Sequence, residues 1–306
     1  MKMKRIILLN IFMALAAASV SAQSLPSLLV GSDAAGFSMG AATVAGRPGA
    51  CSIENNAAAM SFIDGRMCAG ASFGMWQPEF GNDKIAGAGV AVKATERLAF
   101  GAAFKYFVMP SYEITGDSGT ASRDGSFRPS EFNVAAGGSF AMTSYLSVGL
   151  TARVLHSTLA DDVTANVFGA DLGVYFRMKG ITAGISVNNI GTKAKFGESA
   201  YAQPMMAKFG AGYTHAFGKH ALGATVETDI LFSGAVMAGA GAEYSFRDMI
   251  FVRCGYHYGN LDKPVVPSYA SAGIGVKFFG ISLDAAYIFS SEILRNSIGL
   301  SLGYEF

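Results

Sequence analysis

The chain has 306 residues, of which 51% are hydrophobic, 15% charged and 12% aromatic, with 38 glycines. This apolar content is too high for a disordered chain, and 3 cysteines are too few for a disulfide-rich scaffold. The formal net charge is +1 and no basic block follows the extreme N-terminus, which argues against a nucleic-acid partner.

The first 22 residues have the pattern of an export signal. Lys2, Lys4 and Arg5 form a basic start, residues 6–18 are apolar, and residues 20–22 are small or short side chains. The apolar stretch is shorter than the roughly 20 residues that a membrane helix needs, so a cleaved signal is favoured over an uncleaved anchor. We therefore expect a signal peptide over residues 1–22 and export of the mature chain.

The remaining chain alternates large apolar residues with small or charged ones. In residues 98–106, Leu98, Phe100 and Phe104 alternate with Ala99, Gly101 and Lys105. Such a period of two is typical of strands with two different faces. Fourteen segments follow it: 66–77, 84–95, 97–109, 129–142, 145–156, 164–178, 181–189, 204–217, 220–229, 235–246, 249–258, 269–278, 281–289 and 295–306. Most have the length of a tilted membrane-spanning strand, about ten residues or slightly more.

The connections between these segments alternate in length. Turns such as 143–144, 179–180 and 218–219 are tight, whereas the connections 110–128 and 190–203 are long. Outer-membrane barrels have short periplasmic turns and longer external loops. An even number of strands also suits a closed antiparallel cylinder, which leaves no unpaired edge in lipid.

A soluble sheet would also alternate, but its polar face would be rich in Lys and Glu. Here that face is mostly Gly, Ser, Ala and Thr with isolated charges, which fits a crowded interior better. The sequence therefore predicts an all-β fold: a closed antiparallel transmembrane β-barrel of about 14 strands over residues 65–306, in the outer membrane and in contact with its lipid.

The polar face also carries candidate lumen charges. They are Lys105, Arg153, Asp171, Arg177, Lys208, Glu227, Asp229, Arg253, Lys277, Asp284 and Glu305. An ion-selective pore would show an excess of one sign at its constriction. The near balance of signs favours charges that pair with one another and with a plug.

Residues 23–64 precede the first strand and form the predicted plug, which we call the hatch segment. It is rich in Gly and Ala, low in charge and too apolar for a free linker. The frequent inward Gly of the strands would leave room for it, with Phe37, Met39, Met60 and Phe62 buried. The hatch candidates are Gly36, Met39, Gly40, Asn55, Asn56, Met60 and Phe62.

This order of features resembles the PorV/PorQ family of Bacteroidetes outer-membrane proteins, which share the FadL-like barrel with its 14 strands and N-terminal hatch. The resemblance covers essentially the whole mature chain and rests on the stretch Met39-Gly40-Ala41-Ala42, on 56–60 (Asn-Ala-Ala-Ala-Met) and on the terminal Tyr-Glu-Phe. The family has Pro where this chain has Ala57. This difference concerns the rigidity of the hatch turn and does not change the expected fold.

The resemblance implies a non-enzymatic role in type IX protein secretion. PorV-like members bind the signal domain of secreted cargo, and PorQ-like members hold a partner at the cell surface. In this chain the external connection 110–128 offers Tyr112, Arg123, Phe127 and Arg128 for a protein partner, although it also has the composition of a solvated loop.

The same barrel architecture suggests an alternative, namely uptake of hydrophobic small molecules as in FadL-like channels. Phe37, Met39, Trp76 and Phe107 would then line an apolar pocket, and a strand interruption near the hatch would favour this alternative. Contacts within an apolar plug explain the same residues with less assumption.

Catalysis and cofactors find little support in the sequence. The histidines at 156, 215, 220 and 257 lack a cluster of Cys or carboxylates for a metal, and no Ser partner for a nucleophile–base pair can be named. Cys51, Cys68 and Cys254 allow one disulfide, with Cys51–Cys68 as the candidate, but buried small residues are the preferred interpretation. We expect no enzyme, no cofactor and no metal site.

Overall fold

The computed structural model describes residues 25–79, 81–115, 121–160, 163–259, 265–289, 291 and 293–306. The expected signal peptide, residues 1–22, lies outside these residues. Within the described part of the chain, none of the helices is long and apolar enough to cross a membrane.

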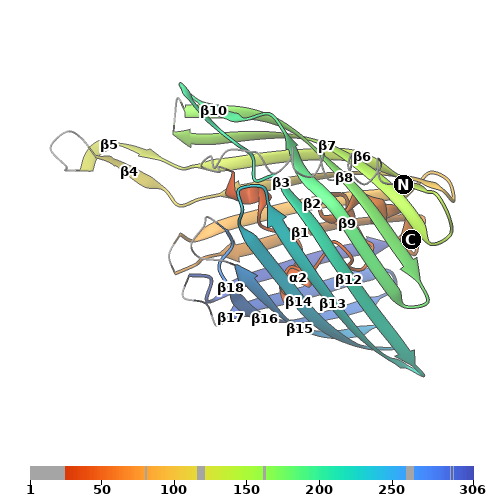
Figure 1. Ribbon diagram of the computed structural model, residues 1–306. Coiled ribbons are helices and arrows are strands. Elements are labelled where there is room, and N and C mark those ends of the chain that lie inside the picture. The colour runs from red at the N-terminus through yellow and green to blue at the C-terminus, as the bar shows by residue number, and fades with distance from the viewer. Residues whose placement is uncertain are drawn as a thin grey trace.

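A closed antiparallel barrel dominates the fold (Figure 1). Its strands are β1 (Met67–Trp76), β2 (Asp83–Lys93), β3 (Leu98–Val108), β6 (Ser130–Ala141), β7 (Leu146–Ala160), β8 (Val163–Met178), β9 (Ile181–Gly191), β12 (Met206–Phe217), β13 (His220–Leu231), β14 (Val236–Phe246), β15 (Ile250–Gly259), β16 (Tyr269–Phe278), β17 (Ile281–Phe289) and β18 (Ser297–Glu305). Each pairs with its neighbours in chain order, and the described residues give a barrel of 14 strands, as the sequence predicts.

The first and last strands close the cylinder. β1 and β18 pair in register from Cys68 opposite Glu305 to Met75 opposite Ile298. The C-terminal residue extends this ladder, because Phe306 N donates to Met67 O at 3.0 Å and Phe306 O accepts from Met67 N at 2.9 Å. No strand edge of the barrel is therefore left open at the seam.

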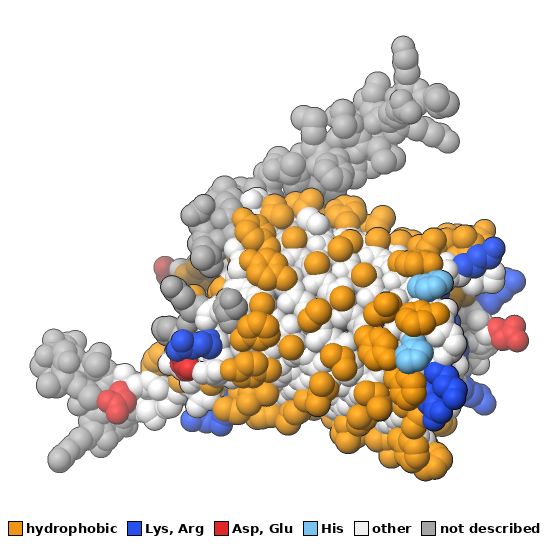
Figure 2. All heavy atoms as spheres, turned by 90° about the horizontal axis from the view of Figure 1, so that it is seen from below, with side chains coloured by type: hydrophobic (Ala, Val, Ile, Leu, Met, Phe, Trp, Pro, Cys, Tyr) orange, Lys and Arg blue, Asp and Glu red, His pale blue; other side chains and the backbone are white. Residues whose placement is uncertain are grey.

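The alternation in the sequence becomes an apolar outside and a mixed inside. Phe100 and Leu300 lie on the outer wall and are 52% and 53% exposed. Ala99, which precedes Phe100 in β3 and lies on the opposite face of the strand, is buried. Figure 2 shows hydrophobic side chains spread over the wall of the barrel, with most of the charged ones toward its two ends. Such an exterior is stable only against lipid, since water would face a very large apolar surface.

Two ends of the barrel can be told apart by their connections. The short turns, such as 179–180 and 218–219, lie at one end, which we call the short-turn end. The opposite end, which we call the external end, carries the hairpin of β4 (Tyr112–Thr115) and β5 (Ala121–Phe127) and the hairpin of β10 (Ala194–Phe196) and β11 (Ser199–Tyr201) (Figure 1). The sequence predicts only connections at these places, because loops rich in Gly and Ser give no clear strand pattern.

The hatch segment forms short helical turns before β1. They are η1 (Pro26–Leu28), α2 (Ala34–Ser38), α3 (Ser52–Asn55) and η2 (Ala57–Phe62). Asp33 caps α2 by accepting from Gly36 N at 2.5 Å, and Asn56 caps η2 by accepting from Ala58 N at 3.2 Å. These side chains satisfy N–H groups that a short helix leaves without a partner.

Candidate functional site

The hatch segment lies against inward positions of the barrel wall that only glycine can occupy. A Cβ atom at Gly184 would overlap the carbonyl oxygen of Val44, and one at Gly149 would overlap the backbone N of Ala58. Within the hatch, Gly40 has a φ of 66° and its missing Cβ leaves space for the carbonyl of Tyr256. The hatch backbone therefore approaches the wall more closely than any side chain would permit.

Polar side chains fix the hatch to the wall at defined points. Asn56 Nδ2 donates to Val44 O at 3.1 Å and to Val174 O at 3.0 Å, which ties two hatch turns to β8. Glu227 of β13 accepts from the backbone N of Thr43 at 2.5 Å and of Val44 at 2.6 Å. Buried hydrogen bonds to a charged group are among the stronger ones in proteins.

The candidate lumen charges all lie in ion pairs. Lys208 Nζ lies 3.2 Å from Glu227 Oε1 and 3.3 Å from Asp229 Oδ2. Arg253 lies 2.6 Å from both Glu243 and Asp284. The other pairs are Lys277–Glu305 at 2.5 Å, Arg177–Asp64 at 3.3 Å, Lys105–Glu54 at 3.7 Å and Arg153–Asp171.

Three of these ion-pair partners were not predicted from the sequence. Glu54 and Asp64 belong to the hatch segment, where no strand period indicates which way a side chain points. Glu243 lies in β14, and its alternation with Tyr244 could have placed it on the inward face. Each of them pairs with a cation that is among the predicted lumen charges.

A cavity of about 590 Å³ lies in the interior at the short-turn end, and we call it the polar cavity because charged side chains lie in its lining beside small apolar ones. The hatch supplies Arg47 and Cys51 to its lining, and the wall supplies Arg177, Arg253 and Lys277. Burial raises the pKa of Asp33 above its ordinary value, against hydrogen bonds from Gly36 and Asn55 that lower it. Burial, together with the nearby charges of Asp33 and Glu54, raises the pKa of the Cys51 thiol well above its usual range.

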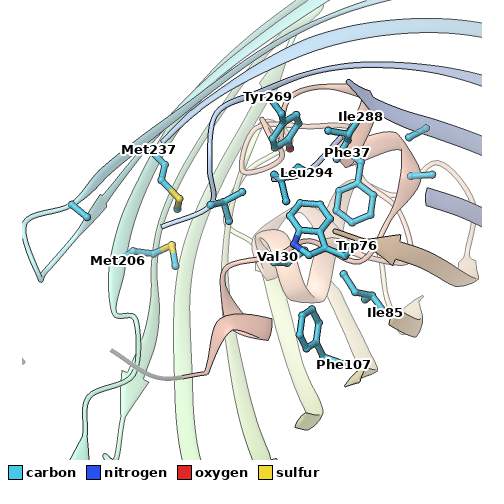
Figure 3. Packing of buried hydrophobic residues seen from close by; sticks show 14 of the residues in the cluster. Val30, Phe37, Trp76, Ile85, Phe107, Met206, Met237, Tyr269, Ile288 and Leu294 are labelled. Carbon is cyan, nitrogen blue, oxygen red and sulfur yellow. The ribbon is translucent and has the colours of Figure 1, made fainter. Parts of the chain in front are cut away.

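The interior at the external end is instead filled by a cluster of buried apolar side chains (Figure 3). The rings of Phe37 and Trp76 lie 5.5 Å apart, and Tyr269 meets Trp76 edge-on at 6.4 Å. We call this the apolar cluster; its labelled members are Val30, Phe37, Trp76, Ile85, Phe107, Met206, Met237, Tyr269, Ile288 and Leu294. It joins residues from the hatch to residues from strands on several sides of the barrel.

The four apolar residues that the sequence suggested for one pocket do not all lie in the same cluster. Phe37, Trp76 and Phe107 lie in the apolar cluster, but Met39 is half-buried and lines the polar cavity. Met206 and Tyr269 were not predicted from the sequence, because their contacts with the hatch depend on where its backbone runs. Met60 is fully buried, and Phe62 is half-buried with its ring 5.8 Å from that of Tyr175.

The candidate partner loop is a paired hairpin rather than an irregular connection. Tyr112 opposes Phe127, and their rings stack at 5.7 Å. Tyr112 and Arg128 are exposed, and Phe127 is half-buried. The side chain of Arg123 lies outside the described part of the structure.

The cysteines and histidines of the described residues form neither a disulfide nor a metal-binding group. All of Cys51, Cys68 and Cys254 are free thiols, so the candidate Cys51–Cys68 bond is not formed. His257 is buried, stacks on Tyr269 at 5.0 Å and contacts Gly40 O at 3.3 Å through Nδ1. Its neighbourhood is that of a residue that supports the hatch.

A closed 14-strand barrel with an apolar exterior defines an outer-membrane β-barrel protein. A family model described as "Type IX secretion system protein PorV" matches residues 15–234, and the chain belongs to this PorV family. No curated protein matches its sequence.

Solved structures with a similar fold are FadL-like barrels. The toluene transporter TodX of Pseudomonas putida has a TM-score of 0.67 and 15% identity, covering 91% of this chain and 99% of its own. The toluene transporter TbuX of Ralstonia pickettii has a TM-score of 0.66 and 13% identity, with the same coverage of 91% and 99%. A FadL homologue of Pseudomonas aeruginosa has a TM-score of 0.57 and 14% identity over 90% of this chain and 98% of its own. At these identities the likeness shows the fold.

Proposed function

We propose that this protein is a non-enzymatic component of type IX protein secretion that binds secreted cargo signal domains or secretion-system components. The observation that carries the proposal is membership of the PorV family, whose description names this secretion system. The protein would do so from the outer membrane, with its external hairpins facing the partner.

The packed external half of the interior supports a binding role over conduction. The apolar cluster occupies the external half, and the candidate lumen charges lie in ion pairs rather than along a path of one sign. A pore selective for ions would need unpaired charge at a constriction. A plugged barrel serves instead as a rigid membrane platform for its external loops.

The hairpin β4–β5 is the surface that we assign to the partner. It forms a separate two-stranded sheet that projects beyond the barrel (Figure 1). A two-stranded sheet has backbone groups free along its outer edges, and an extended segment of a β-rich partner can pair with them. The stacked Tyr112 and Phe127 add apolar contact area at the base of the hairpin.

Transport of hydrophobic small molecules is the second candidate, and a specific feature of the wall favours it. The register between β8 and β9 shifts between Ala170 and Leu172, where Asn189 has a φ of 62°. Such a bulge locally disrupts the hydrogen-bond ladder. Two fold neighbours carry the name toluene transporter, so the apolar cluster would then be the part of the interior that a ligand displaces.

Crosslinking in native membranes followed by affinity purification tests the proposal. The wild-type protein should recover cargo signal domains or secretion-system components. The double variant Tyr112→Ala/Phe127→Ala should recover about fivefold less or lower, since an exposed aromatic contact at an interface contributes about 1–2 kcal/mol. The matched control Tyr287→Ala/Phe289→Ala removes a ring pair that stacks at 6.4 Å on the lipid-facing wall, and it should behave as the wild type.

Two outcomes would contradict the proposal. Recovery of bound hydrophobic molecules without a protein partner would favour the transport alternative. Equal recovery by the hairpin variant and its control would remove the hairpin as the binding surface. Unboiled and boiled gel samples of each variant, which migrate differently for a closed barrel, show that the fold is intact.

A further inference from the structure

The short-turn end carries a cluster of basic and histidine side chains that neither candidate function uses. Lys179, Lys219 and Arg247 lie in the turns β8–β9, β12–β13 and β14–β15, which follow one another around the barrel. All three side chains are exposed. The other short turns differ: residues 95–97 contain one acid and one base, residues 143–144 are uncharged, and residues 279–280 contain an exposed Phe.

Hydrogen bonds hold these turns beside one another. Arg247 N donates to Lys219 O at 2.6 Å, which fixes the β14–β15 turn against the β12–β13 turn. Thr214 N donates to Gly180 O at 2.8 Å, which fixes the β8–β9 turn against β12. Lys219 and Arg247 therefore lie in turns that bond directly to each other, and Lys179 lies in a turn that bonds to Thr214 of β12; we call these three cations the basic arc.

Two of these three basic residues have a positive φ, a backbone conformation that long side chains rarely adopt. Lys179 has a φ of 50° and Arg247 a φ of 56°. Tight hairpin turns with positive φ favour Asn, Asp or Gly at such positions. Long basic side chains there do not help the turn to form, so the turn geometry does not account for the charge at this rim.

An aromatic and histidine ladder lies on the lipid-facing wall directly below the basic arc. The rings follow one another from Tyr213 to His215 at 6.4 Å, to Phe217 at 6.0 Å and to His220 at 5.6 Å. His220 continues the ladder to Phe246 at 5.1 Å. Figure 2 shows two histidines among hydrophobic side chains, next to basic ones at one end of the barrel.

Contacts within the ladder orient its polar atoms. His220 Nδ1 lies 2.7 Å from the hydroxyl of Tyr244, which leaves Nε2 for a partner outside the protein. Arg247 lies over the ring of Phe246 at 5.4 Å. The nearby acids are already engaged, because Asp248 lies 2.5 Å from Arg47 and Glu243 points inward to Arg253 at 2.6 Å.

We propose that this surface, made of Lys179, Lys219, Arg247, His215, His220 and the flanking rings, binds the phosphate-bearing headgroup of an anionic phospholipid. The occupant follows from position and charge. Aromatic rings of a membrane barrel lie at the level of the headgroups, and the short turns face the leaflet on the periplasmic side. Cations and imidazole N–H groups above apolar rings match a phosphate joined to acyl chains.

Native mass spectrometry of the delipidated full chain tests the proposal, with phosphatidylglycerol as the probe and phosphatidylcholine as the zwitterionic comparison. The wild-type protein should retain phosphatidylglycerol in preference to phosphatidylcholine. The variant Lys219→Gln/Arg247→Gln should bind phosphatidylglycerol at least about tenfold more weakly, since each basic residue near an anionic surface contributes about a fivefold gain.

The control variant Lys193→Gln/Lys195→Gln removes the same charge from exposed positions next to and within β10, at the external end. It should bind phosphatidylglycerol as the wild type does. Equal loss in both variants would show that only overall charge matters, and no loss in either would show that no site exists. Displacement of the lipid by an equal concentration of inorganic phosphate would indicate an adventitious ion only. Equal loss in both variants, no loss in either variant and displacement by phosphate would each overturn the proposal. A variant that lacks the heat-dependent gel shift is replaced by the single variant Lys219→Gln, which should bind phosphatidylglycerol about fivefold more weakly than the wild type.

Discussion

The two halves of the barrel interior hold the hatch in different ways. At the external end, the apolar cluster joins Phe37 of the hatch to Trp76 and Tyr269 of the wall. At the short-turn end, a polar cavity of about 590 Å³ separates parts of the hatch from charged wall residues such as Arg253 and Lys277. Dense packing closes one half, while the other stays open enough for water.

This difference has a physical consequence. Apolar burial is non-directional and excludes water from the whole contact, so the external half supplies the seal. Hydrogen bonds such as those of Asn56 and Glu227 are directional and contribute less net free energy each, so they determine where the hatch backbone lies. We therefore expect substitutions in the external half to loosen the plug and substitutions near the cavity to shift it.

The largest effect is expected for Trp76→Ala. Loss of a buried Trp side chain costs about 3–5 kcal/mol when the surroundings do not collapse into the space. The temperature at which the unboiled gel form converts to the boiled form should fall, and hydrophobic solutes should enter the barrel more readily. Gel mobility after heating in steps measures the first effect, and solute uptake by reconstituted vesicles the second.

The matched control for this substitution is Phe100→Ala. Phe100 lies on the outer wall, 52% exposed toward lipid, so its removal leaves the interior packing unchanged. Equal loss of stability in the two variants would contradict the assignment of the seal to the apolar cluster.

A smaller effect is expected for Asn56→Ala. The substitution removes the cap of η2 and the two hydrogen bonds to Val44 O and Val174 O. Loss of an N-cap alone costs about 1–2 kcal/mol, and protease should then cleave the hatch segment faster in the folded barrel. The neighbouring Asn55, which is half-buried and bonds to Asp33, provides the control Asn55→Ala. A faster cleavage in the Asn55 variant than in the Asn56 variant would show that Asn56 does not fix the hatch.

The sequence predicted the barrel well because lipid and lumen impose opposite chemistry on alternate residues. The prediction of 269–278 as a strand matches β16 at both ends, and that of 220–229 falls two residues short of the end of β13. The bulge at Asn188 and Asn189 was not predicted, because it inverts the alternation only for Ile190 and Gly191, the last two residues of β9, which are too few to show the change.

The interior contacts were harder to predict than the strands. Alternation identifies Lys208 as inward-facing, but it does not show that Thr43 and Val44 of the hatch share its partner Glu227. Those contacts depend on the path of a segment with little regular structure. For the same reason Met39 was grouped with Trp76 although it lines the polar cavity instead.

The short-turn half of the interior, which holds the polar cavity, can be tested through the pH dependence of Cys51 alkylation. The raised pKa of this thiol lowers its thiolate fraction at neutral pH, about tenfold for each unit by which the pKa exceeds the pH. In the variant Cys68→Ala/Cys254→Ala, iodoacetamide should therefore react slowly at neutral pH and faster as the pH rises through the alkaline range. A rate profile equal to that of a free peptide thiol would show that the short-turn half is as open as bulk water.

The smallest effect is expected at the rim of the cavity, where Arg47 of the hatch lies 2.5 Å from Asp248. The two side chains are 46% and 55% exposed, and exposed ion pairs contribute about 0–1 kcal/mol. A double-mutant cycle with Arg47→Gln and Asp248→Asn, followed by hatch proteolysis, should give a coupling in this range that fades at high salt. A larger coupling that persists at high salt would mean that the ion pair at the rim also holds the hatch strongly in place. The difference between an external half held by apolar packing and a short-turn half held by directional polar contacts would then no longer hold.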